Sequence, residues 1–324
     1  MRDPGGGVPP SLRAGDRIAV VAPSGPADPA RLERGCAVLR GLGLEVGVGK
    51  HALDRGFASG GVPPGLAYLA GTDADRAADV QDAWCDPRIA AVFCARGGYG
   101  AARVLDHLDW AALRSAAPKL LHGSSDITAL HAAFSRRLSV ATSFGPMVAS
   151  LIADAEPEAL AHLRAWLFGA GAPVTGSHAL RGGRADGLLT GGNLTLLTSL
   201  LGTEHAPEPA AGRVAFLEDV GEAPYRVDRM LTQLLQAGWL DDVAGIMLGT
   251  WIDCGELEAV FADRLTPLGV PILAGVPVGH GPRQLTVRLG VPVLLDADAL
   301  TLDVGNGAAW PARPSGAPAS EEAQ

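Results

Sequence analysis

Residues 120–130 hold the side chains best placed for nucleophilic chemistry. Leu120 and Leu121 close a short apolar run that is typical of a buried strand, and Gly123 permits a tight turn after it. From Asp126 onward the apolar residues fall at helical spacing. A serine between such a strand and helix matches a nucleophile elbow, which exposes the hydroxyl above a sheet. The alternative interpretation is an ordinary serine or aspartate helix cap.

A serine nucleophile needs a general base, and histidine most often serves as one. Of eight histidines, His280 is distinctive because it lies between two glycines after a strand, where other groups can approach the ring closely. A loop histidine without function is the competing interpretation. The other seven lie in helical segments or in loops without a supporting pattern, or precede the turn: His51, His107, His122, His131, His162, His178 and His205.

Glu218 and Asp219 follow a fully apolar strand, so a carboxylate is delivered at the end of that strand. The alternative role is a helix-start acid ahead of the helix expected over 225–239. A serine, a glutamate and a histidine together would follow the logic of a catalytic triad. The histidine takes the serine proton, and the carboxylate orients the imidazole and stabilises its charged form.

Neither a phosphate-binding cofactor nor a metal is indicated by the remaining patterns. The glycine-rich run 96–100 lacks the spacing of a P-loop and that of a dinucleotide-binding turn. There is no HExxH motif, no cluster of histidines and no cysteine pair at metal-ligand spacing. We therefore expect no cofactor and no metal.

Composition narrows the class of protein. A chain of 324 residues is long enough for two domains. Its low aromatic content of 5% predicts a core of Ala, Val, Leu and Ile. The net charge of −9 is spread along the chain without a basic stripe, so nucleic acid is not an expected partner. No apolar run reaches membrane-spanning length, the first ten residues lack a secretory pattern, and four scattered cysteines suit a reducing compartment. These features predict a cytoplasmic protein.

The first half alternates strands and helices, which predicts an α/β domain with a parallel sheet covered on both faces. Strands are expected over 17–22, 44–48, 89–94, 120–121 and 139–143, and helices over 28–42 and 73–84, with a loop over 50–66. Sites in such sheets lie at the carboxyl ends of strands, where Arg96 and Ser125 both fall.

The second half has a different sequence pattern, and we predict the boundary between the two halves in the Gly/Ala/Pro-rich residues 169–174. We expect a flexible leader (1–14), an N-terminal domain (15–168), a linker (169–183), a C-terminal domain (184–310) and a disordered tail (311–324). Helices are expected over 156–168, 193–201, 225–239 and 257–268, strands over 213–217 and 243–248, an extended stretch over 271–276, and short strands within 284–303.

Eight segments, in order over residues 15–303, resemble the LD-carboxypeptidase family of serine peptidases, which trim bacterial cell-wall peptides. Each segment alone is weak, but eight in the same order are specific. They are GDRIAVVAPS (15–24), ARGGYG (95–100), GSSDITAL (123–130), FGPM (144–147), GGNL (191–194), FLEDVGE (216–222), PYRVDR (224–229) and GHG (279–281).

The resemblance implies a flavodoxin-like N-terminal domain and a C-terminal domain with a small barrel-like sheet and helices. It implies a Ser125–Glu218–His280 triad, with Ser125 preferred over Ser124 because Asp-Ile-Thr-Ala-Leu follows it in family register. The N–H groups of Gly98 and Asp126 would form the oxyanion hole. Two departures from the family pattern, Ser124 for an aromatic residue and Phe144 for a histidine, could alter the shape of the pocket.

The activity implied by the resemblance is a metal-free serine carboxypeptidase. It would hydrolyse the L,D-amide bond to terminal D-alanine in murein tetrapeptides, with lysine or diaminopimelate before the bond left open. The free carboxylate of such a substrate favours an arginine, for which Arg96, Arg226 and Arg283 are unranked candidates. A homodimer is left open, and no cofactor is implied.

Two alternative functions accompany this expectation. A microcin C immunity-type peptidase would cleave an aminoacyl-nucleotide-like amide and needs an aromatic residue to stack on the base, for which only Phe57 and Tyr68 are near the 50–66 loop. A peptide-binding protein without catalysis would need a broken triad, whereas all three positions are filled.

Overall fold

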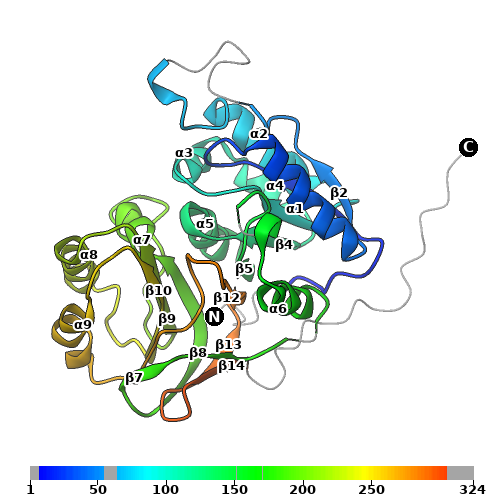
Figure 1. Ribbon diagram of the computed structural model, residues 1–324. Helices are drawn as coiled ribbons and strands as arrows, with labels where there is room; N and C mark the ends of the chain where they lie inside the picture. Colours follow the sequence, from blue (N-terminus) through cyan, green and yellow to red (C-terminus); the bar gives the residue numbers. More distant parts are fainter. Residues whose placement is uncertain (1–6, 55–63, 151, 170, 305–324) are drawn as a thin grey trace, which may run out of the picture.

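The computed structural model describes residues 7–54, 64–150, 152–169 and 171–304. They form two halves packed side by side, each built of one sheet and its helices (Figure 1). The first sheet has the strand order β12-β5-β4-β3-β1-β2. Its five N-terminal strands are parallel, in the 2-1-3-4-5 order of flavodoxin-like folds. They are β1 (Arg17–Val21), β2 (Glu45–Val48), β3 (Ala91–Cys94), β4 (Leu120–Gly123) and β5 (Thr142–Phe144). The predicted fold of this half is confirmed.

Helices cover both faces of this sheet, and each face has its own apolar core. One face carries α1 (Pro29–Gly41) and α6 (Pro157–Leu167), and the other carries α2 (Asp73–Cys85), α3 (Ala101–Val104), α4 (Trp110–Ser115) and α5 (Thr128–Leu138). Local signals start these helices. The Asp28 carboxylate accepts the Arg31 N–H at the start of α1, and Thr72 caps α2 in the same way.

The second sheet has eight strands in the order β6-β14-β13-β8-β9-β10-β11-β7, curled as a half-barrel. Its strands are β6 (Val174–Thr175), β7 (His178–Arg181), β8 (Arg184–Asn193), β9 (Val214–Val220), β10 (Gly245–Ile252), β11 (Ile272–Ala274), β13 (Pro292–Asp296) and β14 (Thr301–Val304). The predicted barrel-like sheet is confirmed.

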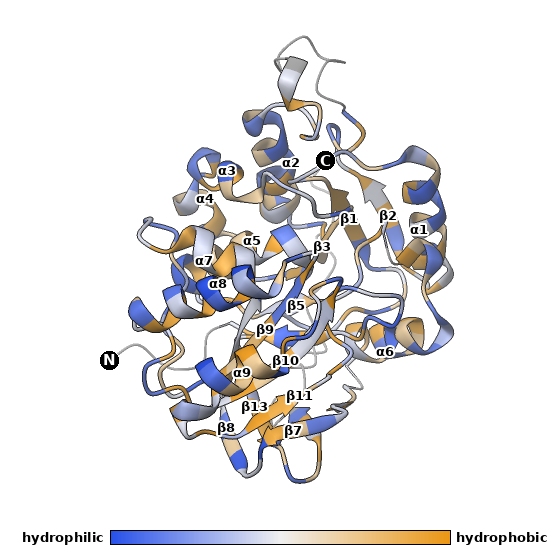
Figure 2. Cartoon of the chain, turned by 60° about the vertical axis from the view of Figure 1, so that its left-hand side comes forward, coloured by the Kyte–Doolittle hydropathy of each residue, from blue (hydrophilic) through white to orange (hydrophobic). Residues whose placement is uncertain are grey.

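Three helices pack on one face of the half-barrel: α7 (Leu194–Leu200), α8 (Pro224–Gln236) and α9 (Glu258–Arg264). The opposite face encloses a separate core that includes Phe216, Met247 and Leu295. Figure 2 shows largely apolar strands at the centre of this half, with much polar surface on α8. Small aliphatic residues dominate both cores, as the low aromatic content predicts.

Strand β12 (Val287–Leu289) joins the two halves, because it comes from the C-terminal part of the chain and pairs antiparallel with β5. The sequence predicted short strands within 284–303 but not that one of them would complete the first sheet. The range expected as a linker, 169–183, contains β6 and β7. The domain boundaries at these positions stay predictions.

Some predicted ranges differ locally from the structure. Strand β5 begins three residues later than expected, because Ser139 ends α5 in a left-handed conformation with φ of 54°. The helix expected over 257–268 divides into α9 and a 3-10 turn, Thr266–Leu268, in which Pro267 occupies the first turn. Within the expected leader, Leu12 is buried and donates its N–H to the Leu167 carbonyl at 2.9 Å.

Other predictions fall on residues that the structure does not describe. These are the leader residues 1–6, the tail 311–324 and residues 55–63 of the expected loop, which include Phe57. In the described part of the chain, no helix is both long and apolar enough to cross a membrane.

Candidate active site

Ser125 occupies the sharp turn between β4 and α5. Its φ is 59°, a left-handed value that is uncommon for residues other than glycine and often marks a functional turn. The turn continues as a 3-10 segment, Ser125–Ile127, before α5 begins. Ser124 makes no side-chain cap bond, and neither does the residue before α5. The geometry therefore matches a nucleophile elbow better than a helix cap.

Glu218 and His280 form a close pair. The His280 Nδ1 atom lies 2.7 Å from the Glu218 Oε2 atom. Glu218 is fully buried in β9, whereas His280 is partly exposed in the loop after β11. Gly279 allows the approach: its φ is 130°, and a Cβ there would lie 2.6 Å from the same carboxylate oxygen. A side chain at position 279 would thus push the histidine and the glutamate apart.

Asn193 connects this pair to the nucleophile's domain. Its Nδ2 donates to Glu218 Oε1 at 3.2 Å, and its backbone N–H donates to Thr128 Oγ1 at 3.0 Å. Thr128 begins α5, three residues after Ser125. A continuous path of hydrogen bonds therefore runs from the helix behind the nucleophile to the carboxylate that holds His280. The sequence marked GGNL only as a segment of the family resemblance, and it assigned Asn193 no role in the site.

The electrostatics of the pair follow from burial and from these bonds. Burial raises the pKa of the Glu218 carboxyl, and the bonds from His280 and Asn193 oppose that rise. Burial alone would lower the pKa of His280, but the hydrogen bond and charge of Glu218 raise it above its ordinary value of 6.5. Because donors face both Glu218 oxygens, the arrangement favours the ionised carboxylate.

Asp219 points away from His280, as adjacent residues of a strand should. Its carboxylate accepts the Asn193 amide at 2.9 Å and both the N–H and the hydroxyl of Thr195, at 2.9 and 2.8 Å. It thus serves the start of α7. The helix-start role considered for this pair of acids was assigned to the wrong helix, because the end of β9 lies beside α7 rather than the start of α8.

Ser125 and His280 line the same cavity, which has a volume of about 400 Å³. The other lining residues lie after β1, β3, β4 and β5, in α1 or in the loop after β11: Asp28, Arg31, Arg96, Gly97, Gly98, Ser124, Met147, Ala149, Ser150 and Gly281. The cavity thus lies at the carboxyl edge of the parallel sheet, where the C-terminal half presents His280. This is the edge that the strand pattern predicted.

The three arginine candidates lie in different places. Only Arg96 lines the cavity. Arg226 lies on α8 beside Tyr225 and Glu222, and Arg283 pairs with Glu158 at 2.5 Å. Arg31 also lines the cavity, although sequence reasoning did not single it out. Its position in the first turn of α1, directly after β1, was the available signal.

The glycine-rich run 96–100, here called the glycine loop, carries the expected oxyanion donor Gly98 and passes close to the serine. A Cβ built on Gly97 would lie 3.2 Å from Ser125 Oγ and 3.4 Å from the Asp126 nitrogen, so the glycine loop passes directly over the elbow. Gly98 follows in a left-handed conformation, with φ of 109°. The Asp126 side chain is buried and accepts hydrogen bonds from the Ser24 hydroxyl and from the Ala101 N–H.

The two departures from the family pattern occupy different environments. Ser124 lines the cavity and can affect its shape directly. Phe144 is fully buried and packs edge-on against Phe216, with ring centroids 5.0 Å apart. Phe144 is absent from the cavity lining, so we expect it to act through the packing between the two halves.

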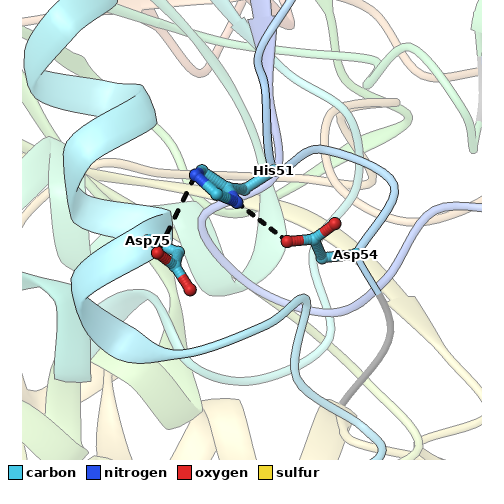
Figure 3. Close-up of side chains that lie close together, drawn as sticks. All are labelled: His51, Asp54 and Asp75. Atoms are coloured by element: carbon cyan, nitrogen blue, oxygen red, sulfur yellow. Dashed lines mark hydrogen bonds and ion pairs between the residues drawn. The ribbon is translucent and has the colours of Figure 1, made fainter. Parts of the chain in front are cut away.

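Two groups of metal-ligand types come together within the described ranges, although neither was expected from sequence. One is His51, Asp54 and Asp75 (Figure 3), and the other is Asp106, Glu204 and His205. In the first group, Asp54 contacts His51 Nδ1 at 2.8 Å, and Asp75 lies 3.8 Å from Nε2. The two carboxylates thus face opposite nitrogens of one ring, an arrangement suited to hydrogen bonding across the imidazole. Neither group lines the cavity of Ser125.

Comparison with known proteins agrees with this architecture. Residues 18–145 match the LD-carboxypeptidase N-terminal domain, and residues 186–295 match the LD-carboxypeptidase C-terminal domain. The protein SCO6489 of Streptomyces coelicolor is 51% identical over 91% of this chain and 96% of its own length. Murein tetrapeptide carboxypeptidase of Pseudomonas aeruginosa is 34% identical over 88% of this chain and 94% of its own.

The structure of MccF in complex with glutamyl sulfamoyl guanosine superposes with a TM-score of 0.81, covering 92% of this chain and 98% of that one. At 24% identity this similarity shows the fold. Fold and family matches together define a peptidase with a two-domain α/β architecture. The chain belongs to the LD-carboxypeptidase family.

Proposed function

We propose that this protein is a serine-type LD-carboxypeptidase that removes the terminal D-alanine from murein tetrapeptides. The observation that carries the proposal is the 2.7 Å Glu218–His280 contact in a cavity that also exposes Ser125 on a strained turn. The relative from Pseudomonas aeruginosa named murein tetrapeptide carboxypeptidase supports the substrate. Membership of the family indicates a peptidase, and the proposed triad would explain how such an enzyme cleaves an amide bond.

In the proposed reaction, Ser125 Oγ attacks the carbonyl carbon of the L,D-amide bond while His280 Nε2 takes the serine proton. The N–H groups of Gly98 and Asp126 stabilise the oxyanion of the tetrahedral intermediate. The C–N bond then breaks, and His280 gives its proton to the departing D-alanine amine. Water, deprotonated by His280, hydrolyses the acyl-enzyme and restores Ser125.

Glu218 supports both half-reactions through His280. Its Oε2 accepts the Nδ1 proton, which leaves Nε2 free to exchange a proton with Ser125. Each time His280 becomes an imidazolium, the adjacent carboxylate stabilises the positive charge. The raised pKa of His280 reflects the same interaction in the resting protein.

Arg96 is the arginine that we propose for the terminal carboxylate of the peptide. It lines the cavity, and its Nη1 makes one long contact, 3.3 Å to the Pro26 carbonyl. Arg31 lines the same cavity but is held by the Ala149 and Ser150 carbonyls and by Asp154. Arg96 is therefore freer to turn toward a ligand.

Mass spectrometry of the products from defined tetrapeptides tests the proposal. We expect loss of one D-alanine from an L-Ala-D-Glu-diaminopimelate-D-Ala or lysine peptide, and no loss with Ser125→Ala. A chelator should leave the rate unchanged, because the nucleophile and the base are side chains. An intact tetrapeptide after prolonged incubation with folded protein, or a chelator-sensitive rate restored by zinc, contradicts the proposal.

A microcin C immunity-type activity is a second candidate, favoured by one observation. Tyr68 and Tyr99 expose 49% and 51% of their surface and stand with ring centroids 5.9 Å apart, and Tyr99 directly follows the cavity residue Gly98. Such a pair could stack on a base. Release of an amino acid from an aminoacyl sulfamoyl nucleoside, faster than D-alanine release, would favour this substrate.

We also propose a cytoplasmic role in recycling cell-wall peptides. All four cysteines are free, and three of them are buried, as is usual in a reducing compartment. Fractionation of cells that express the protein at its natural level, followed by measurement of tetrapeptide accumulation after its deletion, tests the location and the role.

A further inference from the structure

The Asp126 carboxylate, which the proposed mechanism does not use, is buried directly behind the nucleophile. Its side chain belongs to a residue that is only 1% exposed. Oδ2 accepts the Ser24 hydroxyl at 2.5 Å and the Ala101 N–H at 2.8 Å, whereas Oδ1 is buried without a hydrogen bond among the described residues. A buried charge of this kind is costly unless other groups compensate it.

Arg76 adds a smaller compensating charge and a further hold on the loop. It is likewise 1% exposed, and its Nη1 donates to the Pro23 and Gly100 carbonyls at 2.6 and 2.8 Å. Burial raises the pKa of Asp126, while the bonds from Ser24 and Ala101 and the charge of Arg76 lower it. Arg76 also forms an ion pair with Asp73.

These contacts join the three segments that end at the cavity. Ser24 follows β1, Ala101 follows the glycine loop after β3, and Asp126 follows β4. Two further contacts draw the first two segments together: the Gly25 N–H donates to the Gly97 carbonyl at 3.2 Å, and Arg76 holds the Gly100 carbonyl. The glycine loop is thus held at Gly97, where it passes over Ser125, and at Gly100.

Glycine is required at positions 97 and 100 because a side chain there would collide with the groups that surround the loop. A Cβ on Gly100 would lie 2.6 Å from Arg76 Nη1, and one on Gly97 would lie 3.0 Å from the Ser125 Cβ. The loop has no side chains of its own to hold it at these points. Its position over the nucleophile therefore depends on the groups around it.

We propose that Asp126, acting through Ser24 and Ala101 together with Arg76, is a positioning residue that holds the glycine loop and the elbow in the geometry of the oxyanion hole. The inference rests on the proposed serine mechanism and deepens it. Asp126 would contribute twice: its N–H faces the oxyanion, and its carboxylate fixes the loop that presents the second donor, Gly98. A displacement of about 1 Å in such a site can cost about 10²-fold in rate.

Three substitutions separate the effect of the Asp126 charge from that of its hydrogen bonds. Asp126→Asn can place its oxygen at Oδ2 and its NH₂ at the unpartnered Oδ1, so it keeps both hydrogen bonds but removes the charge. Ser24→Ala removes one bond and keeps the charge. Asp126→Ala removes the charge and both hydrogen bonds. Asp79→Asn is the matched control, because Asp79 is a buried carboxylate that accepts the His51 N–H at 2.8 Å but lies outside the cavity.

The experiment measures the second-order rate of serine phosphonylation by a fluorophosphonate, together with kcat and KM for a tetrapeptide, on variants shown by circular dichroism to be folded. We expect phosphonylation and kcat to fall together, about 10²-fold for Asp126→Ala and about 3- to 10-fold for Ser24→Ala and Asp126→Asn, with KM within about twofold. Asp79→Asn should match the natural protein.

The outcomes distinguish the inference from the function on which it rests. If the natural protein is not labelled at all, the serine mechanism fails and the inference fails with it. If the natural protein is labelled but Ser24→Ala and Asp126→Asn react within twofold of it, the mechanism stands and the positioning role is wrong. A rise in KM at unchanged kcat would also contradict it, because it would place these groups in substrate binding.

Discussion

The two halves of the molecule hold their parts of the candidate site by different means. The N-terminal half presents Ser125 mainly through backbone geometry, with a left-handed φ of 59° between a buried strand and a helix and a glycine loop packed above it, and the buried Asp126 carboxylate bonds to that backbone at Ala101. The C-terminal half positions His280 through side chains, in a path from Asn193 to Glu218 to the imidazole.

This difference separates the requirements of a nucleophile from those of a base. A hydroxyl needs only to be exposed in one direction, which a short strained turn achieves with residues adjacent in sequence. An imidazole must keep one tautomer and accept a charge, which requires a buried carboxylate. Glu218 precedes His280 by sixty-two positions, so only tertiary structure can bring them together.

Replacement of the nucleophile should have the largest effect. Ser125→Ala removes the one exposed hydroxyl of the elbow, and we expect kcat to fall by about 10⁵- to 10⁶-fold at an unchanged melting temperature. Ser124→Ala is the control, because it removes a neighbouring hydroxyl from the same cavity and should retain most of the activity. The reverse pattern in steady-state assays would move the assignment by one residue.

Replacement of the triad carboxylate should follow. Glu218→Gln keeps the size of the side chain but presents the wrong partner to His280 Nδ1, so kcat should fall by about 10⁴-fold, by analogy with other triads. The melting temperature should change little, because the amide still accepts one hydrogen bond. A loss below tenfold in the same assay would show that His280 works without this carboxylate.

The pH dependence should show the coupling between Glu218 and His280 within the C-terminal half. His280 must be neutral to take the serine proton, and the raised pKa of His280 places the acidic limb of kcat/KM above pH 6.5. In Glu218→Gln this limb should shift to lower pH. Protonated His280 likewise stabilises the fold below about pH 6.5, and this contribution is lost as the pH rises through the folded-state pKa. A limb at the same pH in both proteins would contradict the coupling.

Replacement of the neighbouring acid should have the smallest effect on catalysis. Asp219→Asn weakens the bonds to Asn193 and Thr195 at the start of α7, so we expect about 1–2 kcal/mol less stability in urea unfolding. The kcat value should stay within a fewfold of normal, because Asp219 does not contact His280. A loss comparable with that of Glu218→Gln would mean that Asp219 has a direct role in the chemistry.

Much of this arrangement could be predicted from local sequence. The alternation of apolar strands and helices indicated the parallel sheet, and the segment around Gly123 and Ser125 indicated the elbow, because both depend on residues close together in the chain. The glycines beside His280 indicated a close approach to the ring, and Gly279 indeed lies against Glu218.

The remainder depends on contacts between distant residues. Strand β12 is only three residues long, and its place beside β5 is set by the way the two halves pack. Asn193 donates to Glu218 across 25 positions, and Asp126 accepts from Ser24 across 102. The place of Arg31 after β1 was a local signal, but its bond to the Ala149 carbonyl depends on the loop after β5. No local pattern carries such information.

The most direct test of a nucleophile in one half activated by a base in the other is the site and rate of phosphonylation by a fluorophosphonate. The account predicts one adduct, mapped to Ser125 by peptide mass spectrometry, that forms at least about 10²-fold more slowly in His280→Ala and in Glu218→Gln. An adduct on another residue, or an adduct on Ser125 that forms equally fast in both variants, would contradict it.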